Sequence, residues 1–399
     1  MSADATLDVQ VYKDLESLQS LRSQWEQLLQ QYSHSTTFST WEWLTSWWRA
    51  FARNDQLCVL AFRNGSSLIG IAPLSITRRK VYGSQLRVLR FMGDGSHDSD
   101  NLDIPLSGGR ESEVSRSFCT WLQENHGEWD ICELHTMASN SPLAAKLVED
   151  LKGRGWTCYS STRPQSLINL PETWDAYLKM LSSKERGKVG NRYRKLEKRY
   201  QLKIYKCESE SELDACLNKL FELHAKHWNA RGLPGTLHVA ERRQFYRDLG
   251  RQLLARKRLE FWLLDVNGQT VATHFGLRHE HTVFSLQEGF DPAYHADSVG
   301  YVLRSQVLKT VIADGVRRYD FLGGVDDSKL RWGAEVRNYV DIDFARPLSK
   351  GGVYLRAKYG SGSAKQWLRA NLPQPVWRKL QQLRGHRENK AQNPANTED

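Results

Sequence analysis

A repeated hairpin is the feature that most constrains how this 399-residue chain folds. Residues 56–74 read QLCVLAFRNGSSLIGIAPL, and residues 259–277 read LEFWLLDVNGQTVATHFGL. In both, an Asn-Gly pair separates two apolar runs, and the pairs lie 203 positions apart. This pattern predicts a tight β-hairpin with a type I′ turn, because that turn needs positive φ at both central residues. The echo predicts two copies of one α/β unit, at about residues 1–165 and 166–348.

The second predicted unit is the more regular of the two. Apolar residues at three- and four-residue steps predict a helix from Leu213 to Trp228, before the hairpin. After it, the patterns predict a strand at 282–291, a helix at 298–315 and a strand at 319–322. The first unit continues instead through a segment rich in glycine and aspartate, 91–106, with no comparable helix start. If only one unit keeps chemistry, we expect it to be the second.

The net charge of +10 is concentrated in two segments. Residues 184–199 carry eight Lys or Arg against two Glu, and residues 350–399 carry ten against three acids. Such segments indicate an anionic partner, either a small molecule or a sugar-linked substrate. We interpret 349–399 as a basic tail. Its apolar residues from Val376 to Leu383 allow peripheral contact with a membrane surface.

Several classes of protein lack their signatures here. The six cysteines form no CxxC pair and no zinc-type cluster with histidine, so we expect no metal site. No apolar run reaches the ~18 residues of a membrane span, and no signal peptide is recognisable, so we expect a cytoplasmic protein. The motifs of serine hydrolases, zinc proteases, P-loop enzymes and Rossmann dehydrogenases are missing.

Three stretches have residue types suited to group transfer. Ser298 and Gly300 begin a predicted helix, where free N–H groups and the helix dipole attract anions. Residues 182–200 predict a basic helix on which Arg192 shares a face with other cations. Lys329 follows a strand that ends in two glycines, and can neutralise a phosphate or a developing oxyanion. Asp326, next to it, is our candidate general base. For each stretch a purely structural role is the alternative.

The second unit resembles a known family. HAKHWNARG, NGQTVATHFGLRH, EGFDPAYHADSVGYVL and YDFLGGVDDSKLRWGAE occur in the order found in GNAT-like acyltransferases of the cellulose-biosynthesis (CelD/BcsL) type, which are related to the Fem peptidyltransferases. The resemblance covers about residues 170–347 and extends loosely to 36–106. It implies an α/β (α+β) fold of two tandem GNAT-like, Fem-type units, each a mixed sheet flanked by helices, the first of them degenerate.

The resemblance also implies roles for individual residues. The lysine of the Fem-type K-x-x-aromatic-G pattern falls on Lys329, and its aromatic residue falls on Trp332. The residues that open the cofactor-binding helix fall on Ser298, Gly300 and Tyr301. The family's basic S-x-K-x-R run falls on Ser182, Lys184 and Arg186, and its His/Trp pair, which shapes the cleft, falls on His224 and Trp228. Together with Arg192 of the basic helix and with Trp332, the residues Lys184, Arg186, His224 and Trp228 are our candidate substrate-binding positions.

One loop departs from the family pattern. A GNAT pyrophosphate loop usually reads Q/R-x-x-G-x-G/A, but here the sequence is HADSVG, which keeps only the last glycine. Asp297 in this loop places a negative charge where a phosphate would bind, so we expect weak binding of coenzyme A.

The leading hypothesis is acyl transfer, chiefly N-acylation, to a polysaccharide- or nucleotide-sugar-related acceptor in exopolysaccharide or cell-envelope biosynthesis. Acetyl-CoA or another acyl-CoA is the expected donor. A Fem-like transferase that uses aminoacyl-tRNA is one alternative. A general nucleic-acid-binding protein rests on charge alone and lacks a recognisable binding motif, so tRNA is the only nucleic acid that we expect as a partner. A non-catalytic binding protein of a polysaccharide machine is the other alternative.

Overall fold

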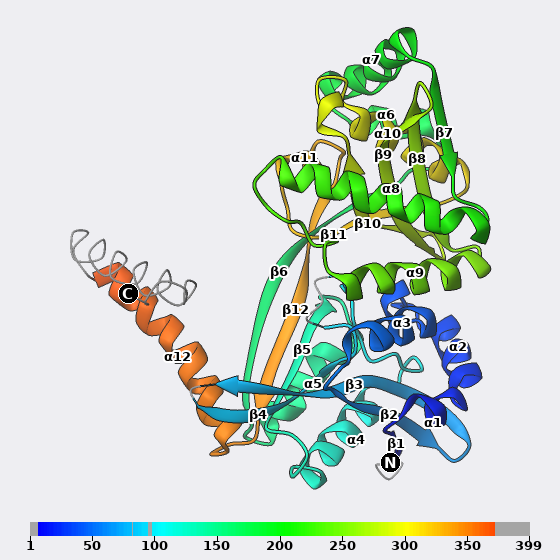
Figure 1. Ribbon diagram of the computed structural model, residues 1–399. Helices are drawn as coiled ribbons and strands as arrows, with labels where there is room; N and C mark the ends of the chain where they lie inside the picture. The colour runs from blue at the N-terminus through cyan, green and yellow to red at the C-terminus, as the bar shows by residue number, and fades with distance from the viewer. Residues whose placement is uncertain (1–6, 82, 95–97, 372–399) are drawn as a thin grey trace, which may run out of the picture.

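The computed structural model describes residues 7–81, 83–94 and 98–371, with side chains up to residue 360. No helix in these ranges is long and apolar enough to cross a membrane. The same ranges hold no group of His, Cys, Asp or Glu side chains suited to a metal ion. The predicted mixed α/β fold, with sheet flanked by helices, is confirmed, and its strands form one large sheet (Figure 1).

Twelve strands of the described residues form one sheet, in the order β1-β2-β3-β4-β5-β12-β6-β11-β10-β9-β8-β7. The strands are β1 Asp8–Tyr12, β2 Gln56–Asn64, β3 Ser67–Val81, β4 Ser84–Phe91, β5 Ile131–Ala138, β6 Thr157–Asn169, β7 Leu202–Lys206, β8 Leu259–Val266, β9 Gln269–His279, β10 Thr282–Phe290, β11 Arg318–Gly323 and β12 Glu335–Ala345. The helices are α1 Leu15–Gln19, α2 Arg22–Gln31, α3 Trp41–Phe51, α4 Glu111–Glu124, α5 Pro142–Gly153, α6 Trp174–Met180, α7 Ser183–Arg199, α8 Glu210–Asn229, α9 Ala240–Ala255, α10 Val299–Ala313, α11 Asp327–Leu330 and α12 Lys350–Asn371, with short 3-10 turns at Thr37–Ser39 and Pro292–Tyr294.

The sheet consists of two halves that meet between β12 and β6, and the strands of the two halves follow the same order from the outer edge to the centre. Strands β1 to β5 on one side correspond to β7 to β11 on the other, and each set contains one parallel pair, β4–β5 or β10–β11. The last strand of each unit is exchanged, because β12 lies beside β5 and β6 lies beside β11. The exchanged strands pair with each other along all of β12, from Glu335 with Leu167 to Ala345 with Thr157. This repetition supports the duplicated unit inferred from the hairpins.

The two hairpins differ in their turns. In the second, Asn267 and Gly268 have φ of 50° and 83° between the paired residues Val266 and Gln269, so the predicted type I′ geometry is confirmed. In the first, Asn64 is itself the last strand residue and pairs with Ser67. Only Gly65 has positive φ there, so the prediction of a type I′ turn was wrong for this hairpin.

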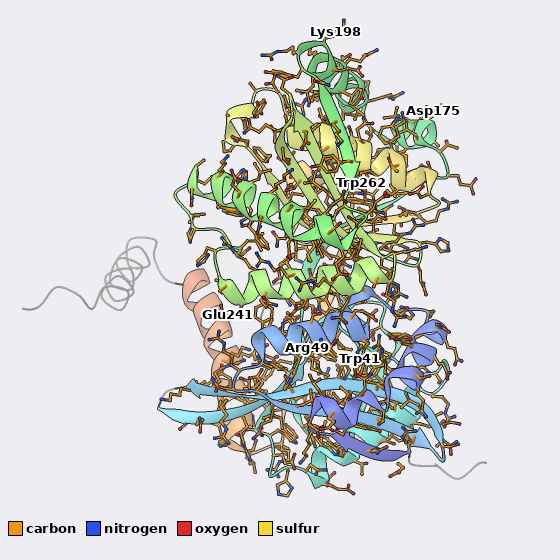
Figure 2. All side chains as sticks on the ribbon, turned by 45° about the vertical axis from the view of Figure 1, so that its right-hand side comes forward. Trp41, Arg49, Asp175, Lys198, Glu241 and Trp262 are labelled. Carbon is orange, nitrogen blue, oxygen red and sulfur yellow. The ribbon has the colours of Figure 1, made fainter. Side chains whose placement is uncertain are left out.

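The two units pack through helices α3 and α9. Figure 2 shows α9, marked by Glu241, lying over α3, marked by Arg49 and Trp41. The Trp43 ring meets the Phe245 ring edge-on, with 5.1 Å between centroids. Both side chains are fully buried, so one apolar core continues across the junction.

The segment after β4 crosses from the first unit to the second. Asp98 pairs with Arg242 of α9 at 3.0 Å, and Asp100 accepts a hydrogen bond from the Gly323 N–H at 3.0 Å. The glycine- and aspartate-rich stretch therefore supplies carboxylates to the second unit. The helix that joins the parallel strands of the first unit, α4, begins only after this stretch, at Glu111.

Helix α12 begins against the sheet and then extends away from the body (Figure 1). Lys358 donates to Asp343 of β12 at 2.6 Å, and the Tyr359 ring stacks on Tyr159 of β6 at 4.2 Å. The predicted basic tail thus begins as a helix packed on the exchanged strands. The membrane-contact prediction for Val376 to Leu383 lies outside the described residues.

Candidate active site

A split between β10 and β11 opens the sheet in the second unit. The two strands pair in parallel only from Thr282 with Arg318 to Phe284 with Asp320. Beyond this point β10 is paired only with β9, past a bulge that leaves Leu286 out of the ladder, and β11 is paired only with β6. The divergence makes room between two strands of one sheet.

Helix α10 starts at the edge of this split. Ser298 precedes the helix in the left-handed conformation, with φ of 58°, and its side chain makes no capping bond. Serine is a common helix-capping residue, but the Ser298 side chain does not cap α10. Among the described residues, no oxygen accepts a hydrogen bond from the N–H groups of Val299, Gly300 or Tyr301. Three donors at a helix N-terminus suit a phosphate group.

A cavity of about 430 Å³ beside this helix start brings five of the predicted residues together. They are Arg192, Ser298, Gly300, Tyr301 and Trp332. The Tyr301 and Trp332 rings lie 4.3 Å apart, and the Arg192 guanidinium lies 4.3 Å from the Tyr301 ring centre. We name this cavity the donor cleft.

A second, strongly basic cleft of about 500 Å³ adjoins the donor cleft and shares Arg192 and Ser298 with it. Lys195, Lys198 and Arg199 of α7 also line it. Arg199 forms an ion pair with Asp297, and the Tyr200 hydroxyl donates to the same carboxylate at 3.2 Å. The expected repulsion of phosphate by Asp297 is therefore offset, and the basic residues outnumber it.

Sequence reasoning missed an ion pair in the wall of the donor cleft. Glu288 of β10 and Arg304 of α10 form a bidentate ion pair in its wall. Desolvation opposes ionisation of Glu288, but the Arg304 charge holds its pKa below the usual value. The Arg304 guanidinium also lies 5.7 Å from the Trp332 ring centre, so the pair helps to position that ring. The residues lie 16 positions apart in an unremarkable sequence context, which gave no signal.

Lys329 is held by the main chain. Its ammonium donates to the carbonyls of Phe321, Gly323 and Gly324 at 3.2, 2.7 and 3.1 Å. Desolvation lowers the pKa of this lysine. All three of its N–H donors therefore have partners at the end of β11, where they fix the backbone that follows the split. The oxyanion role expected for Lys329 would require it to leave these carbonyls.

Asp326 caps the short helix α11. Its carboxylate accepts from the N–H groups of Ser328 and Lys329 at 2.8 and 3.1 Å, and from the Ser328 hydroxyl. Partial burial raises the pKa of Asp326, but these bonds outweigh it and the net shift is downward. A carboxylate so stabilised is a poor proton acceptor, so the structure does not support the expected role of general base.

Two other carboxylates at the split are better bases. Asp320 of β11 is buried, and desolvation raises its pKa to about 7, with a further contribution from the nearby negative charge of Asp100. Desolvation also raises the pKa of Asp100 to about 6. Asp320 accepts from the Leu322 N–H at 2.7 Å and from the Asn101 amide at 3.5 Å. Sequence reasoning missed both because Asp320 lies within an apolar strand and Asp100 lies in the other unit.

The remaining predicted residues lie away from the donor cleft. Lys184 and Arg186 are exposed on the first turn of α7. His224 is buried in α8, where desolvation lowers its pKa to about 4. It packs with Trp228 beneath Gly235, whose φ of 69° and lack of a side chain allow this close approach. These two rings support α8 without lining either cleft.

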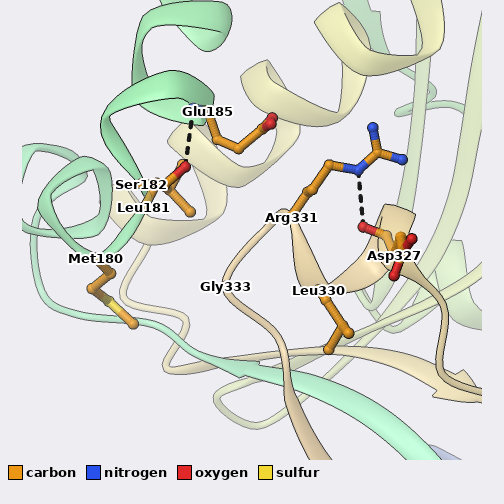
Figure 3. Close-up of a pocket in the computed structure, with 8 residues that line it drawn as sticks. All are labelled: Met180, Leu181, Ser182, Glu185, Asp327, Leu330, Arg331 and Gly333. Atoms are coloured by element: carbon orange, nitrogen blue, oxygen red, sulfur yellow. Dashed lines mark hydrogen bonds between the residues drawn. The ribbon is translucent and has the colours of Figure 1, made fainter.

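A shallow groove of about 590 Å³ lies near Lys184, between the α6–α7 turn and α11 (Figure 3). The Ser182 hydroxyl accepts from the Glu185 N–H at 3.3 Å and so caps α7, while Arg331 donates to the Asp327 carbonyl at 2.9 Å. Arg331 also lines the donor cleft, so the groove extends from that cavity.

Residues 183–330 match the sequence family described as Acetyltransferase (GNAT) domain. This range spans the basic helix α7, the split and the start of α11. No curated protein matches the chain in sequence.

Several solved structures share the fold. The crystal structure of FemX has a TM-score of 0.57 at 9% identity, covering 81% of this chain and 95% of FemX. A protein of unknown function from Bacteroides thetaiotaomicron has a TM-score of 0.53 at 14% identity, covering 85% of this chain and all of its own. The C-terminal domain of a protein named as a lysylphosphatidylglycerol synthetase, from Agrobacterium fabrum, has a TM-score of 0.50 at 9% identity, covering 85% and 96%. The chain thus carries a GNAT-type acetyltransferase domain, within a fold that is similar to that of FemX.

Proposed function

We propose that the chain transfers an acyl group from a coenzyme A thioester to an amine or hydroxyl of a sugar-related acceptor. The observation that carries this proposal is the split itself. An open helix N-terminus with a basic cleft lies at its edge, and a buried carboxylate with a pKa near 7 lies on β11. The narrower resemblance to CelD/BcsL-type sequences supports an acceptor from cell-envelope or exopolysaccharide synthesis.

The donor cleft supplies binding and orientation. The N–H groups of Val299, Gly300 and Tyr301 suit a pyrophosphate, and the α7 cations suit a further phosphate of the same donor. The left-handed Ser298 opens these N–H groups in a loop that lacks the usual glycines. When bound, the thioester supplies an activated acyl carbon.

Asp320 takes the proton in the proposed reaction. The acceptor nitrogen or oxygen bonds to the acyl carbon, the carbon–sulfur bond breaks, and the sulfur leaves as a thiolate. The proton lost by the acceptor moves to Asp320 and from there to solvent. A pKa near 7 matches this task, because the group is then ionised at neutral pH and still basic.

Calorimetry with acetyl-CoA, followed by an assay of thiol release with amino sugars and nucleotide sugars, tests the proposal. We expect micromolar to millimolar binding, and release of thiol that depends on the acceptor. Failure of any acyl-CoA to bind at millimolar concentration would exclude this donor. Tight binding without turnover on any acceptor would favour the non-catalytic alternative.

An aminoacyl-tRNA donor is a second candidate, favoured by the concentration of cations on α7. Arg192, Lys195, Lys198 and Arg199 line one cleft and would suit a phosphate backbone. Filter binding of tRNA over a salt series separates the two donors. A steep loss of affinity with salt, together with no binding of acyl-CoA, would support this candidate.

A further inference from the structure

A separate cavity lies between the two units. It has a volume of about 330 Å³ and is lined by residues of the loop before α3, the crossing segment, the loop after β5, and strands β6, β10, β11 and β12. Its size is at the lower end of the range for small-molecule sites. We name it the interunit pocket.

The walls of the interunit pocket are mostly polar. Of sixteen lining residues, only Ala138, Leu167 and Phe284 are apolar. Gln165 is 6% exposed, and its amide oxygen has no hydrogen-bond donor among the described residues. Burying a carbonyl oxygen without a hydrogen-bond donor is unfavourable, and a ligand hydroxyl or N–H group that donates to it would remove this penalty. Amides and hydroxyls that surround one small cavity match the hydroxyl groups of a sugar ring.

Two arginines give the interunit pocket a positive side. Arg318 has no carboxylate within ion-pair distance among the described residues, and Arg337 pairs only with the exposed Glu335, at 2.9 Å. Neither pairs with Asp320, the one acidic residue that lines the cavity. A guanidinium whose N–H groups are not taken up by a buried carboxylate can bind the two oxygens of a ligand carboxylate or phosphate.

The interunit pocket reaches the split from the face opposite to the donor cleft. Side chains alternate along a strand, so Asp320 and Phe321 point to opposite faces of β11. Phe321 packs with Trp332 and Arg304 on the donor side, whereas Asp320 lines the interunit pocket. A ligand in this pocket therefore meets the proposed base directly.

We infer that the interunit pocket binds the acceptor as one sugar ring that carries an acidic group. The ring hydroxyls meet Gln165, Asn101 and Asn140, and the acidic group meets Arg318 and Arg337. The reacting amine or hydroxyl then lies at Asp320. This inference rests on the proposed function, since it names the acceptor of that reaction.

Saturation-transfer NMR titrations with glucose 6-phosphate, glucuronate and glucose test the inference on the full chain. We expect at least one acidic sugar to bind about tenfold or more tightly than glucose. Arg318→Gln and Arg337→Gln should each remove most of this difference. Arg317→Gln is the matched control, because Arg317 does not line the pocket, and its guanidinium contacts Glu172 at 3.9 Å and the Val316 carbonyl at 3.4 Å. It should leave the difference intact.

Equal binding of the acidic and neutral sugars, or no effect of either arginine substitution, would overturn the inference. Glucuronate carries a carboxylate and glucose 6-phosphate carries a phosphate, so their relative affinities tell which of the two groups the pocket prefers. The same samples receive acetyl-CoA by calorimetry. If the wild-type chain binds acetyl-CoA but no sugar, only the inference about the interunit pocket is refuted. If it does not bind acetyl-CoA, the proposed function is refuted.

Discussion

At the scale of single residues, burial of Asp320 links reactivity to pH. Desolvation raises its pKa to about 7, so the carboxylate is mostly protonated at pH 6 and mostly ionised at pH 8. Acyl transfer should therefore rise tenfold per pH unit below about 7 and level off above it. Asp320→Asn should lower the rate about 100- to 10,000-fold and abolish this inflection. Initial rates of both chains at saturating donor, from pH 5.5 to 9, measure this pH dependence. The same pH–rate profile in Asp320→Asn as in the wild-type chain would show that another group takes the proton.

The same burial makes Asp320 a destabilising residue at high pH. Its folded-state pKa lies above the unfolded value of about 3.9, so the folded state prefers the protonated form. The associated stability is present below pH 4 and is lost as the pH rises through about 7. Asp320→Asn should hence raise the free energy of unfolding by about 1–4 kcal/mol at pH 8 and change it little at pH 4. Urea unfolding at the two pH values measures the difference, and a loss of stability at pH 8 would contradict it.

Lys329 is the residue for which structural and catalytic roles make different predictions. Lys329→Met keeps the length of the stem but removes all three donors to the carbonyls of Phe321, Gly323 and Gly324. We expect a loss of about 1–3 kcal/mol of stability, because these acceptors lose charged partners. Thermal unfolding measures this loss beside the rate of transfer. A large fall in rate with unchanged stability would restore the oxyanion role.

At the scale of elements, the start of α10 depends on one left-handed residue. Ser298 has φ of 58°, which glycine adopts freely and a β-branched residue strongly resists. Ser298→Gly should therefore preserve donor affinity, whereas Ser298→Val should weaken it about tenfold or more by closing the N–H groups of α10. Calorimetric titration of both variants with acetyl-CoA measures this. Equal affinities would mean that these N–H groups do not hold the donor.

The regular elements of the second unit were predictable, since hydrophobic periodicity reports local structure. The strand expected at 282–291, the helix at 298–315 and the basic helix within 182–200 appear as β10, α10 and α7. Ser298, Gly300 and Tyr301 lie together at the start of α10, and Arg192 of α7 and Trp332 line the same cavity. Prediction failed for Asp100, because its partner Gly323 lies 223 positions away. It also failed for Lys329, because its partners are nearby main-chain carbonyls, which no side-chain pattern marks.

At the scale of the whole molecule, the exchanged strands bind the two units into one sheet. Strand β12 belongs to the second unit in sequence but pairs only with β5 and β6, both of which precede residue 170. Strand β6 in turn supplies the neighbour of β11. The boundary that we propose between the units, at 165/166, thus lies within a strand that both units share. The base at the split depends on both, because Asp100 comes from the first unit and Asp320 from the second.

This exchange predicts that neither unit folds alone. A chain cut between Pro171 and Glu172 leaves the fragment 172–399 with β12 wholly unpaired and with β11 as an open edge. Unpaired strands promote aggregation, so each fragment should be insoluble or unfolded when it is produced separately. Produced together, the fragments should assemble through β6 and β12, unfold in one thermal transition and bind acetyl-CoA as the intact chain does. Circular dichroism melts and calorimetry of the separate and combined fragments measure this. A fragment 172–399 that melts cooperatively and binds the donor by itself would show that the second unit is self-sufficient and that the exchange serves only to join the two.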